Sequence, residues 1–212
     1  MKKYLFPLFI SFVLIISFSL PARSQLKTVK KEPRNNWSIG FSYSERGFGP
    51  SASYYIPTGK STDLFFNIGI SNVTDSREIE RTDIFGNTFV ADKVNRVFMM
   101  PLSIGIRKEL FKGDIEGDFT PLINFGVSPT LILMNPYDKN FFSAIGYTTA
   151  SYGLGGFAGL GVSFRQSRDM SINFNLSYYY IQVLGKEVQS IRGSTIDNAG
   201  GLQLAFGINF MK

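Results

Sequence analysis

Apolar and polar residues alternate along eight stretches of the chain that contain no Asp, Glu, Lys or Arg. The first stretch shows the pattern most simply, because every second residue from Trp37 to Tyr43 is large and apolar and the residues between are Ser or Gly. Successive side chains of a strand point to opposite faces, so a period of two predicts β-strands. The eight predicted strands are residues 37–44, 47–56, 64–73, 97–106, 119–133, 153–164, 170–182 and 198–210.

The composition of the two strand faces predicts where the strands lie. A strand face in water normally carries charged residues, whereas here the second face holds Ser, Gly, Asn and Ala. Such residues suit the lumen of a narrow barrel whose apolar face meets lipid. A tilted transmembrane strand needs about 9 to 11 residues, and the length of each stretch is near this value or above it. We therefore expect an all-β fold, an eight-stranded antiparallel up-and-down transmembrane β-barrel over residues 37–210.

The connections between the predicted strands alternate in length. Two connections, 57–63 and 165–169, are short, and three, 74–96, 134–152 and 183–197, are long and fall on one side of an up-and-down meander. Outer-membrane barrels have short periplasmic turns and longer external loops. The tight external link 45–46 and the longer periplasmic link 107–118 depart from this pattern. The pattern places the long loops outside the cell and both chain ends in the periplasm.

The N-terminus has the features of a secretory signal peptide. Lys2 and Lys3 precede an apolar run, and Ala22-Arg23-Ser24 forms a small-x-small cleavage site. We expect a signal peptide over residues 1–24, cleavage between Ser24 and Gln25, and a polar periplasmic lead-in over 25–36. Removal of Lys2, Lys3 and Arg23 lowers the net charge from +6 to +3, a weak surplus that argues against a nucleic-acid partner.

Several aromatic residues fall near predicted strand ends. Tyr and Trp are enriched at membrane interfaces, where one side of the ring contacts lipid and the other contacts water. The predicted interfacial aromatics are Trp37, Tyr43, Tyr54 and Tyr178. The cell outer membrane is the expected location, with its lipid as the first partner.

The absence of His and Cys removes Ser-His-Asp triads, thiol nucleophiles and the usual metal sites from consideration. Asp114, Glu116 and Asp118 have the spacing of a Ca²⁺ loop, but the bidentate Glu that completes such a loop is missing. The glycines of 153–161 lie inside a predicted strand, not between a strand and a helix as a nucleotide-binding loop requires. We expect no catalytic residue, no cofactor and no metal, and therefore no enzyme.

The C-terminal strand resembles the assembly signal of outer-membrane barrels, with Gln203, Ala205, Ile208 and Phe210 at its main positions. The segments 98–108 (FMMPLSIGIRK) and 123–129 (INFGVSP) resemble strands of the PorT-like outer-membrane β-barrel family of Bacteroidetes. This resemblance implies a monomeric eight-stranded barrel that the barrel-assembly machinery inserts. It also implies an association with protein secretion and another envelope protein as partner.

Three functional hypotheses follow. In the first, the barrel acts by binding or structural interaction through its external loops, among them the mixed-charge loop 74–96. The loop 134–152, with Phe141, Phe142, Tyr147 and Tyr152, either contacts a partner or glycan or packs over the barrel mouth. The second hypothesis is a narrow passive pore, although Phe65, Phe157 and Tyr179 share the lumen face and would fill it. The third is a soluble lipocalin-like barrel whose apolar faces point inward.

Overall fold

The computed structural model describes residues 35–45, 47–75, 77–111, 115 and 118–211. The predicted signal peptide, its cleavage site at Ser24 and Gln25, and most of the lead-in lie outside the described residues. Within the described residues, no helix is long and apolar enough to cross a membrane.

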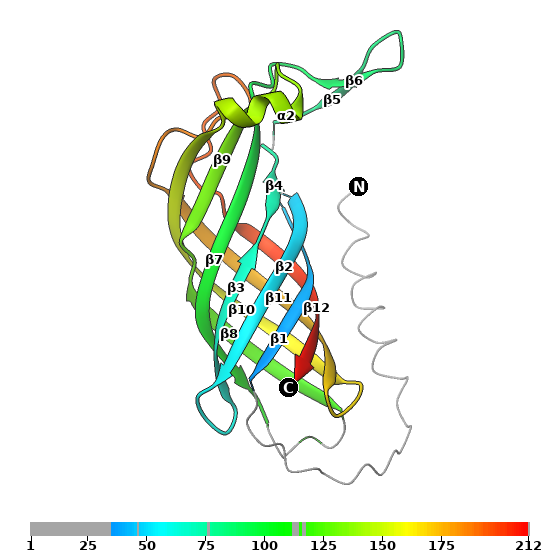
Figure 1. Cartoon of the computed structure of the whole chain (residues 1–212), viewed down its shortest axis with the longest axis vertical. Coiled ribbons are helices and arrows are strands. Elements are labelled where there is room, and N and C mark those ends of the chain that lie inside the picture. The colour runs from blue at the N-terminus through cyan, green and yellow to red at the C-terminus, as the bar shows by residue number, and fades with distance from the viewer. Residues whose placement is uncertain (1–34, 46, 76, 112–114, 116–117, 212) are drawn as a thin grey trace, which may run out of the picture. The chain divides into compact units, whose positions relative to one another are not determined.

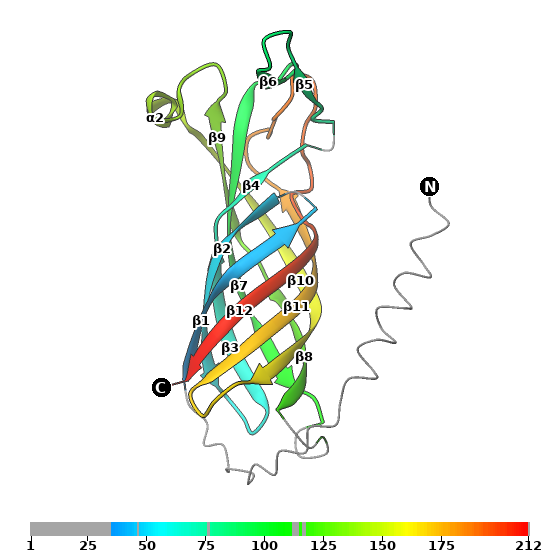
Figure 2. The ribbon, with the colours of Figure 1, turned by 90° about the vertical axis from the view of Figure 1, so that its right-hand side faces the viewer.

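The described residues form a closed antiparallel β-barrel (Figures 1 and 2). Its wall consists of β1 (Asn36–Ser44), β2 (Gly47–Pro57), β3 (Thr62–Gly69), β4 (Ser71–Val73), β7 (Asn95–Glu109), β8 (Phe119–Val127), β9 (Thr130–Pro136), β10 (Thr149–Arg165), β11 (Met170–Val183) and β12 (Gly201–Met211). Segments β3 and β4 follow one another along β7, and β8 and β9 together continue one strand between β7 and β10. The wall therefore has eight strands, as the sequence predicts.

Pairing of the last strand with the first closes the barrel. Trp37 of β1 is the cross-strand partner of Phe210 of β12, and their rings stack with centroids 4.7 Å apart. Both barrel termini therefore lie at one end, which we call the lower end; the long connections lie at the opposite, upper end (Figure 1). The meander and the grouping of the three long connections at one end of the barrel are confirmed.

The two faces of the wall are oriented as predicted, with the apolar face outward. Along β1, the large side chains from Trp37 to Tyr43 are exposed, whereas Asn36 and Ser38 are buried in the lumen. The same alternation along β11 places Phe174 outside and Asn173 inside. A lipocalin-like barrel would require the reverse arrangement.

The structure differs from the prediction in the strand ends and in the upper loops. Strand β7 continues to Glu109, so Arg107 lies in the barrel wall and not in a turn. The predicted strand 119–133 is interrupted at Pro129, which has no amide hydrogen for the ladder. The upper loops also contain elements that the sequence did not predict, a hairpin of β5 (Glu80–Thr82) and β6 (Thr88–Val90) and the short helices α2 (Phe141–Ala144) and η1 (Ile145–Tyr147).

Candidate functional site

The connection between β11 and β12 folds into the upper mouth of the barrel. Its residues Val188, Ile196 and Ala199 are buried, and the amide of Ile196 donates to the carbonyl oxygen of Val188 at 2.8 Å. These side chains belong to one apolar cluster with inward-facing residues of the wall, namely Val73, Val97, Met99, Ile132, Met134 and Ile181. Burial of apolar surface thus holds this connection as a cap over the lumen.

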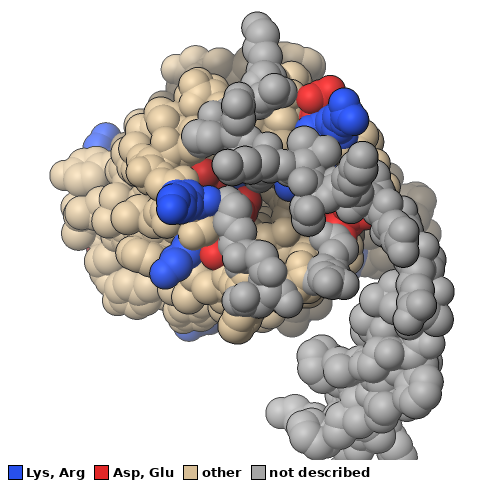
Figure 3. Space-filling view, turned by 90° about the horizontal axis from the view of Figure 1, so that it is seen from below, with Lys and Arg blue, Asp and Glu red and all other residues tan. Residues whose placement is uncertain are grey.

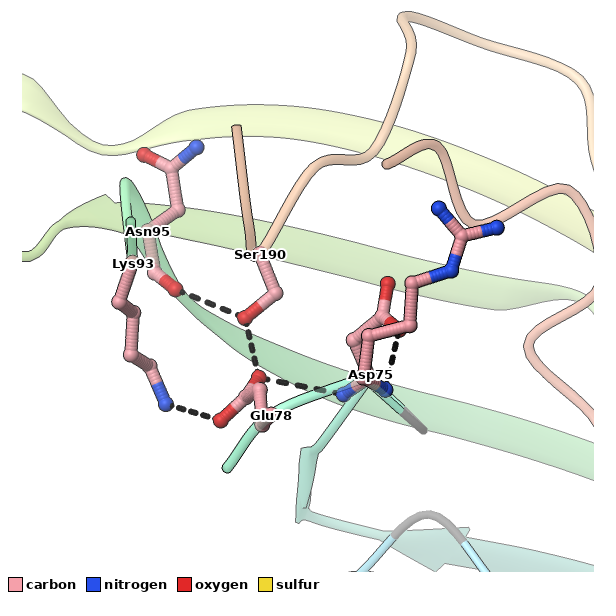
Figure 4. Close-up of polar contacts among 6 residues, drawn as sticks. Asp75, Glu78, Lys93, Asn95 and Ser190 are labelled. Carbon is pink, nitrogen blue, oxygen red and sulfur yellow. Dashed lines mark hydrogen bonds and ion pairs between the residues drawn. The ribbon is translucent and has the colours of Figure 1, made fainter. Parts of the chain in front are cut away.

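A carboxylate joins the cap to the loop between β4 and β7 (Figure 4). Glu78 Oε2 accepts from Lys93 Nζ at 2.5 Å, and Oε1 accepts from the Ser190 hydroxyl at 2.5 Å and from the Asp75 amide at 3.1 Å. The Ser190 Oγ is also 3.1 Å from the carbonyl oxygen of Asn95. The Glu78 side chain is only 5% exposed, so its charge is stabilised by these donors and not mainly by water.

The hydrogen bonds set the ionisation of Glu78. Burial alone raises the pKa of this carboxyl group, but the hydrogen bonds from Lys93, Ser190 and the Asp75 backbone, together with the positive charge of Lys93, lower it further than burial raises it. The net result is a pKa below the ordinary glutamate value, so Glu78 is ionised at neutral pH.

Further polar contacts tie the same two loops together. The Ser194 hydroxyl donates to Asp75 Oδ2 at 2.7 Å, and Asn95 Nδ2 donates to the carbonyl oxygen of Gln189 at 2.8 Å. The amide of Val94 donates to the carbonyl oxygen of Ser190 at 2.8 Å. The sequence predicted an external loop of mixed charge at 74–96 and gave no indication of these contacts, because their partners are more than 90 residues away along the chain.

Four aromatic rings form a layer across the lumen. The ring of Phe157 stacks on Tyr179 with centroids 4.9 Å apart and meets Phe65 edge-on at 5.8 Å, and Phe65 contacts Tyr55 at 5.8 Å. Gly105 leaves room for this layer, because a Cβ there would lie 2.9 Å from Phe157 Cζ. The predicted filling of the lumen by Phe65, Phe157 and Tyr179 is confirmed, and Tyr55 is an additional member.

An ion pair lies against the aromatic layer. Arg107 Nη2 and Nε donate to Asp63 Oδ2 at 2.6 and 3.1 Å, and the guanidinium carbon lies 3.7 Å from the centroid of the Tyr55 ring. Both side chains are largely buried. The sequence did not identify this pair because both residues were assigned to turns.

The rest of the lumen is small and polar. A cavity of about 80 Å³ is lined mainly by Ser, Gly and Asn, and both Gln203 and Ala205 of the C-terminal strand contribute to its wall. The side-chain amide of Asn173 is buried there, and neither its Nδ2 nor its Oδ1 forms a hydrogen bond with another protein group. Buried groups of this kind normally bond to ordered water.

The predicted interfacial aromatics lie on the outer surface at two heights. Trp37 and Tyr54 are cross-strand partners at the lower end of β1 and β2, and Phe210 stacks on Trp37. Tyr43 lies near the upper end of β1, and Tyr178 is paired with Leu202 where β12 begins. Ile208 and Phe210 share the outward face of β12, opposite to Gln203 and Ala205. The four predicted aromatic residues therefore lie near the two ends of the outer wall, and their place at membrane interfaces stays a prediction.

Charged side chains gather at the lower end of the barrel, where basic and acidic residues lie together around the opening (Figure 3). Asp118 is in this region, directly before β8, whereas Asp114 and Glu116 lie outside the described residues. No group of three or more His, Cys, Asp or Glu within the described part of the chain is placed to hold a metal ion.

Comparison with solved structures relates the chain to outer-membrane barrels. Neisserial surface protein A is 11% identical, with a TM-score of 0.54 over 84% of this chain and 95% of that protein. A major outer membrane protein from Thermus thermophilus is 14% identical, with a TM-score of 0.54 over 84% of this chain and 99% of that protein. At these identities the likeness shows the fold alone.

Comparison of the sequence with known families and proteins does not assign the chain to a family. No family model matches the chain, and no curated protein matches it. The PorT-like resemblance therefore stays a prediction.

Proposed function

We propose that this chain is an integral outer-membrane protein that acts by binding a partner through its extracellular loops. The observation that carries the proposal is the closed lumen: the upper mouth holds a packed cap, and the aromatic layer crosses the barrel below it. Such a barrel serves as a rigid support for the loops above it.

The outer face of the wall supports the membrane location. Large apolar side chains cover β1, β11 and β12 on the outside, and they would be costly to expose to water over so large a surface. Aromatic residues at two heights match the two interfaces of a bilayer. The upper end is then extracellular and the lower end periplasmic, in agreement with the predicted signal peptide.

The filled lumen disfavours the alternative of a narrow passive pore. In an eight-stranded barrel the side chains can fill the interior, and here Phe157, Tyr179 and the Arg107–Asp63 pair occupy it. The chain lacks the His and Cys on which much enzyme chemistry depends, so binding is also preferred over catalysis.

The β5–β6 hairpin is the proposed binding element. Its tip carries Ile84 and Phe85, both strongly exposed, and exposed apolar groups on a surface loop favour contact with a partner. The loop bases are held by Glu78 and Asp75, so the hairpin projects from a fixed support. The proposed partner is another envelope protein, in line with the secretion association that the PorT-like resemblance implies. During insertion, β12 is the strand that the barrel-assembly machinery would recognise.

The membrane location is tested with boiled and unboiled samples of the purified outer-membrane fraction on an SDS gel. Folded barrels often resist SDS until they are heated, so a heat-dependent mobility shift is expected. Recovery in the soluble fraction without such a shift would reject the membrane assignment. In planar bilayers the purified protein should show no single-channel conductance, and steady conductance would favour the pore instead.

The binding role is tested by replacing residues 80–90 with a short Gly-Ser turn. This variant keeps Asp75, Glu78 and Lys93, so the cap and the heat-dependent mobility shift should persist. Chemical cross-linking in whole cells should lose the partner that the unchanged protein captures. Equal recovery of that partner would show that the hairpin is not the binding element.

A further inference from the structure

The α2–η1 segment packs against the outside of the barrel wall. Phe141 of α2 meets Phe98 edge-on, with ring centroids 6.0 Å apart. Phe98 lies between Val97 and Met99 on β7, and both of these neighbours are buried in the core of the lumen. Since strand residues alternate between faces, the side chain of Phe98 lies on the outer face, and Phe141 covers it from outside.

Two further residues show the same arrangement. Asn135 of β9 occupies an outward position, between the inward Met134 and the end of the strand, yet it is only 4% exposed. Its Nδ2 donates to the Thr148 hydroxyl at 3.4 Å, directly after η1. Ala144 of α2 is fully buried. The segment therefore covers the outer wall, and the alternative that it packs over the barrel mouth is wrong for Phe141.

The covered patch is continuous with the apolar outer surface of the barrel. Phe98 has Leu133 of β9 as its cross-strand partner on one side and Asn72 of β4 on the other. Further down β7 the outward positions are Met100, Leu102, Ile104 and Ile106. Asn72 Oδ1 in turn accepts from the amide of Phe48 at the upper rim of β2. The segment thus lies beside the upper rim of the surface that faces lipid in the proposed function.

The composition of this segment differs from that of the other long loops. The charged residues of the β9–β10 connection are Asp138 and Lys139 at its start, and 140–148 contains none, whereas 74–96 and 184–197 carry charges of both signs along their length. Phe142 is 83% exposed, and Ile145 and Tyr147 are also exposed. A loop surrounded by water does not usually present three large apolar side chains within six residues that contain no charge.

We propose that the α2–η1 segment is an interfacial anchor that lies in the outer leaflet of the membrane, with Phe142 and Ile145 inserted among the lipids. An apolar segment at headgroup depth is stabilised when its apolar side chains are buried at the boundary between the headgroups and the acyl chains. Lys139 Nζ lies 3.9 Å from the centroid of the Tyr147 ring, so a cation and an amphipathic ring sit together, as is common at membrane interfaces. This inference rests on the proposed membrane location.

Tryptophan fluorescence tests the anchor, because Trp37 is the one tryptophan of the chain. In a Trp37→Phe background, Phe142→Trp introduces the reporter at the anchor, and the protein is refolded into phosphatidylcholine vesicles with or without brominated acyl chains. We expect emission at shorter wavelength than in water and a loss of intensity in brominated vesicles. Phe85→Trp in the β5–β6 hairpin is the matched control, since Phe85 is also 83% exposed; it should be quenched by aqueous acrylamide and not by brominated lipid.

A third reporter separates the anchor from the membrane location. Leu204→Trp lies on the outward face of β12 and should be quenched by brominated lipid whether or not the anchor exists. Quenching at Leu204→Trp without quenching at Phe142→Trp would overturn the anchor alone. The anchor would also be overturned if Phe142→Trp were shielded from water in native outer membrane but not in vesicles, because a partner protein would then cover it. No quenching at either position, in a variant with the heat-dependent mobility shift, would overturn the membrane location as well.

Discussion

Arg107 on β7 lies directly across from Asp63 on β3, and the two side chains form an ion pair inside the barrel. The guanidinium group also lies over the ring of Tyr55, one of the four aromatic residues that cross the lumen. Removal of one partner from a largely buried pair leaves the other charge without compensation, and this is more costly than replacing both partners by apolar groups.

Arg107→Met should therefore lower the free energy of unfolding by about 3 kcal/mol, because Asp63 would remain charged and unpaired. The double variant Arg107→Met, Asp63→Leu should recover a large part of this loss. Urea unfolding of the protein in lipid vesicles measures both values. A double variant that is less stable than Arg107→Met would show that the pair is not the main contribution of these residues.

The two faces of β11 should respond differently to charge. In the unchanged protein the ring of Phe174 lies on the outward face, with its centroid 5.2 Å from that of Phe206. Phe174→Arg places a cation there and should lower the free energy of unfolding in a bilayer by about 2 to 4 kcal/mol. Asn175→Asp places a charge in the polar lumen and should cost less. The comparison uses the same vesicles and denaturant for both variants, and the opposite order would exclude an outward apolar face.

The aromatic layer should contribute strongly to stability. Phe157→Ala removes the ring that stacks on Tyr179 and meets Phe65, and truncation of a buried Phe costs about 3 to 5 kcal/mol. Phe157→Leu retains more of the volume and should cost less. Equal stability of Phe157→Ala and the unchanged protein would mean that the lumen collapses or hydrates without cost.

The cap should loosen in acid because of Glu78. Its pKa is lower in the folded protein than the ordinary value of 4.5, so ionised Glu78 stabilises the cap above pH 4.5, and this contribution is lost as the pH falls through the lowered pKa. The protection of the Val94 and Asn95 amides against hydrogen exchange, corrected for the intrinsic rate, should fall over that range. Both amides donate to the carbonyl oxygen of Ser190.

Two variants separate this effect from general acid destabilisation. Glu78→Gln should reduce the protection at neutral pH and remove its dependence on pH. Asp83→Asn is the control: hydrogen bonds from the side chain and backbone of Asn87 lower the pKa of Asp83 as well, but this residue belongs to the exposed β5–β6 hairpin. If Asp83→Asn changed the protection of Val94 as much as Glu78→Gln, Glu78 would not be the group responsible.

The barrel could be predicted from the sequence because its pattern is local. The alternation from Trp37 to Tyr43 and along β11 directly records which side chains face outward. Absence of charge was a less accurate guide to strand ends, because Arg107 and Asp63 are charged and still lie in the wall. A charged residue in a lumen is tolerated when an oppositely charged residue on the next strand pairs with it. Predicting strands from the absence of charge takes no account of such a pair.

The arrangement of the upper loops could not be predicted in this way. Glu78 meets Ser190, and Asp75 meets Ser194, only after the barrel has brought the two connections to the same end. The position of Phe141 outside the wall likewise depends on the path of the chain after β9. Its sequence indicated an exposed aromatic residue but not the surface that it covers.

The contact between Trp37 and Phe210 has a consequence for biogenesis. These residues stand at opposite ends of the barrel sequence, so the seam between β1 and β12 has nearly the largest sequence separation that the barrel allows. Contacts of such long range form slowly, because closing a long chain loop costs entropy before the contact repays it. Until this seam closes, β1 and the last paired strand each present an unpaired edge that can join another chain. The protein must therefore be kept from aggregating until the seam closes, and a chain shortened by one strand would remain in that open state.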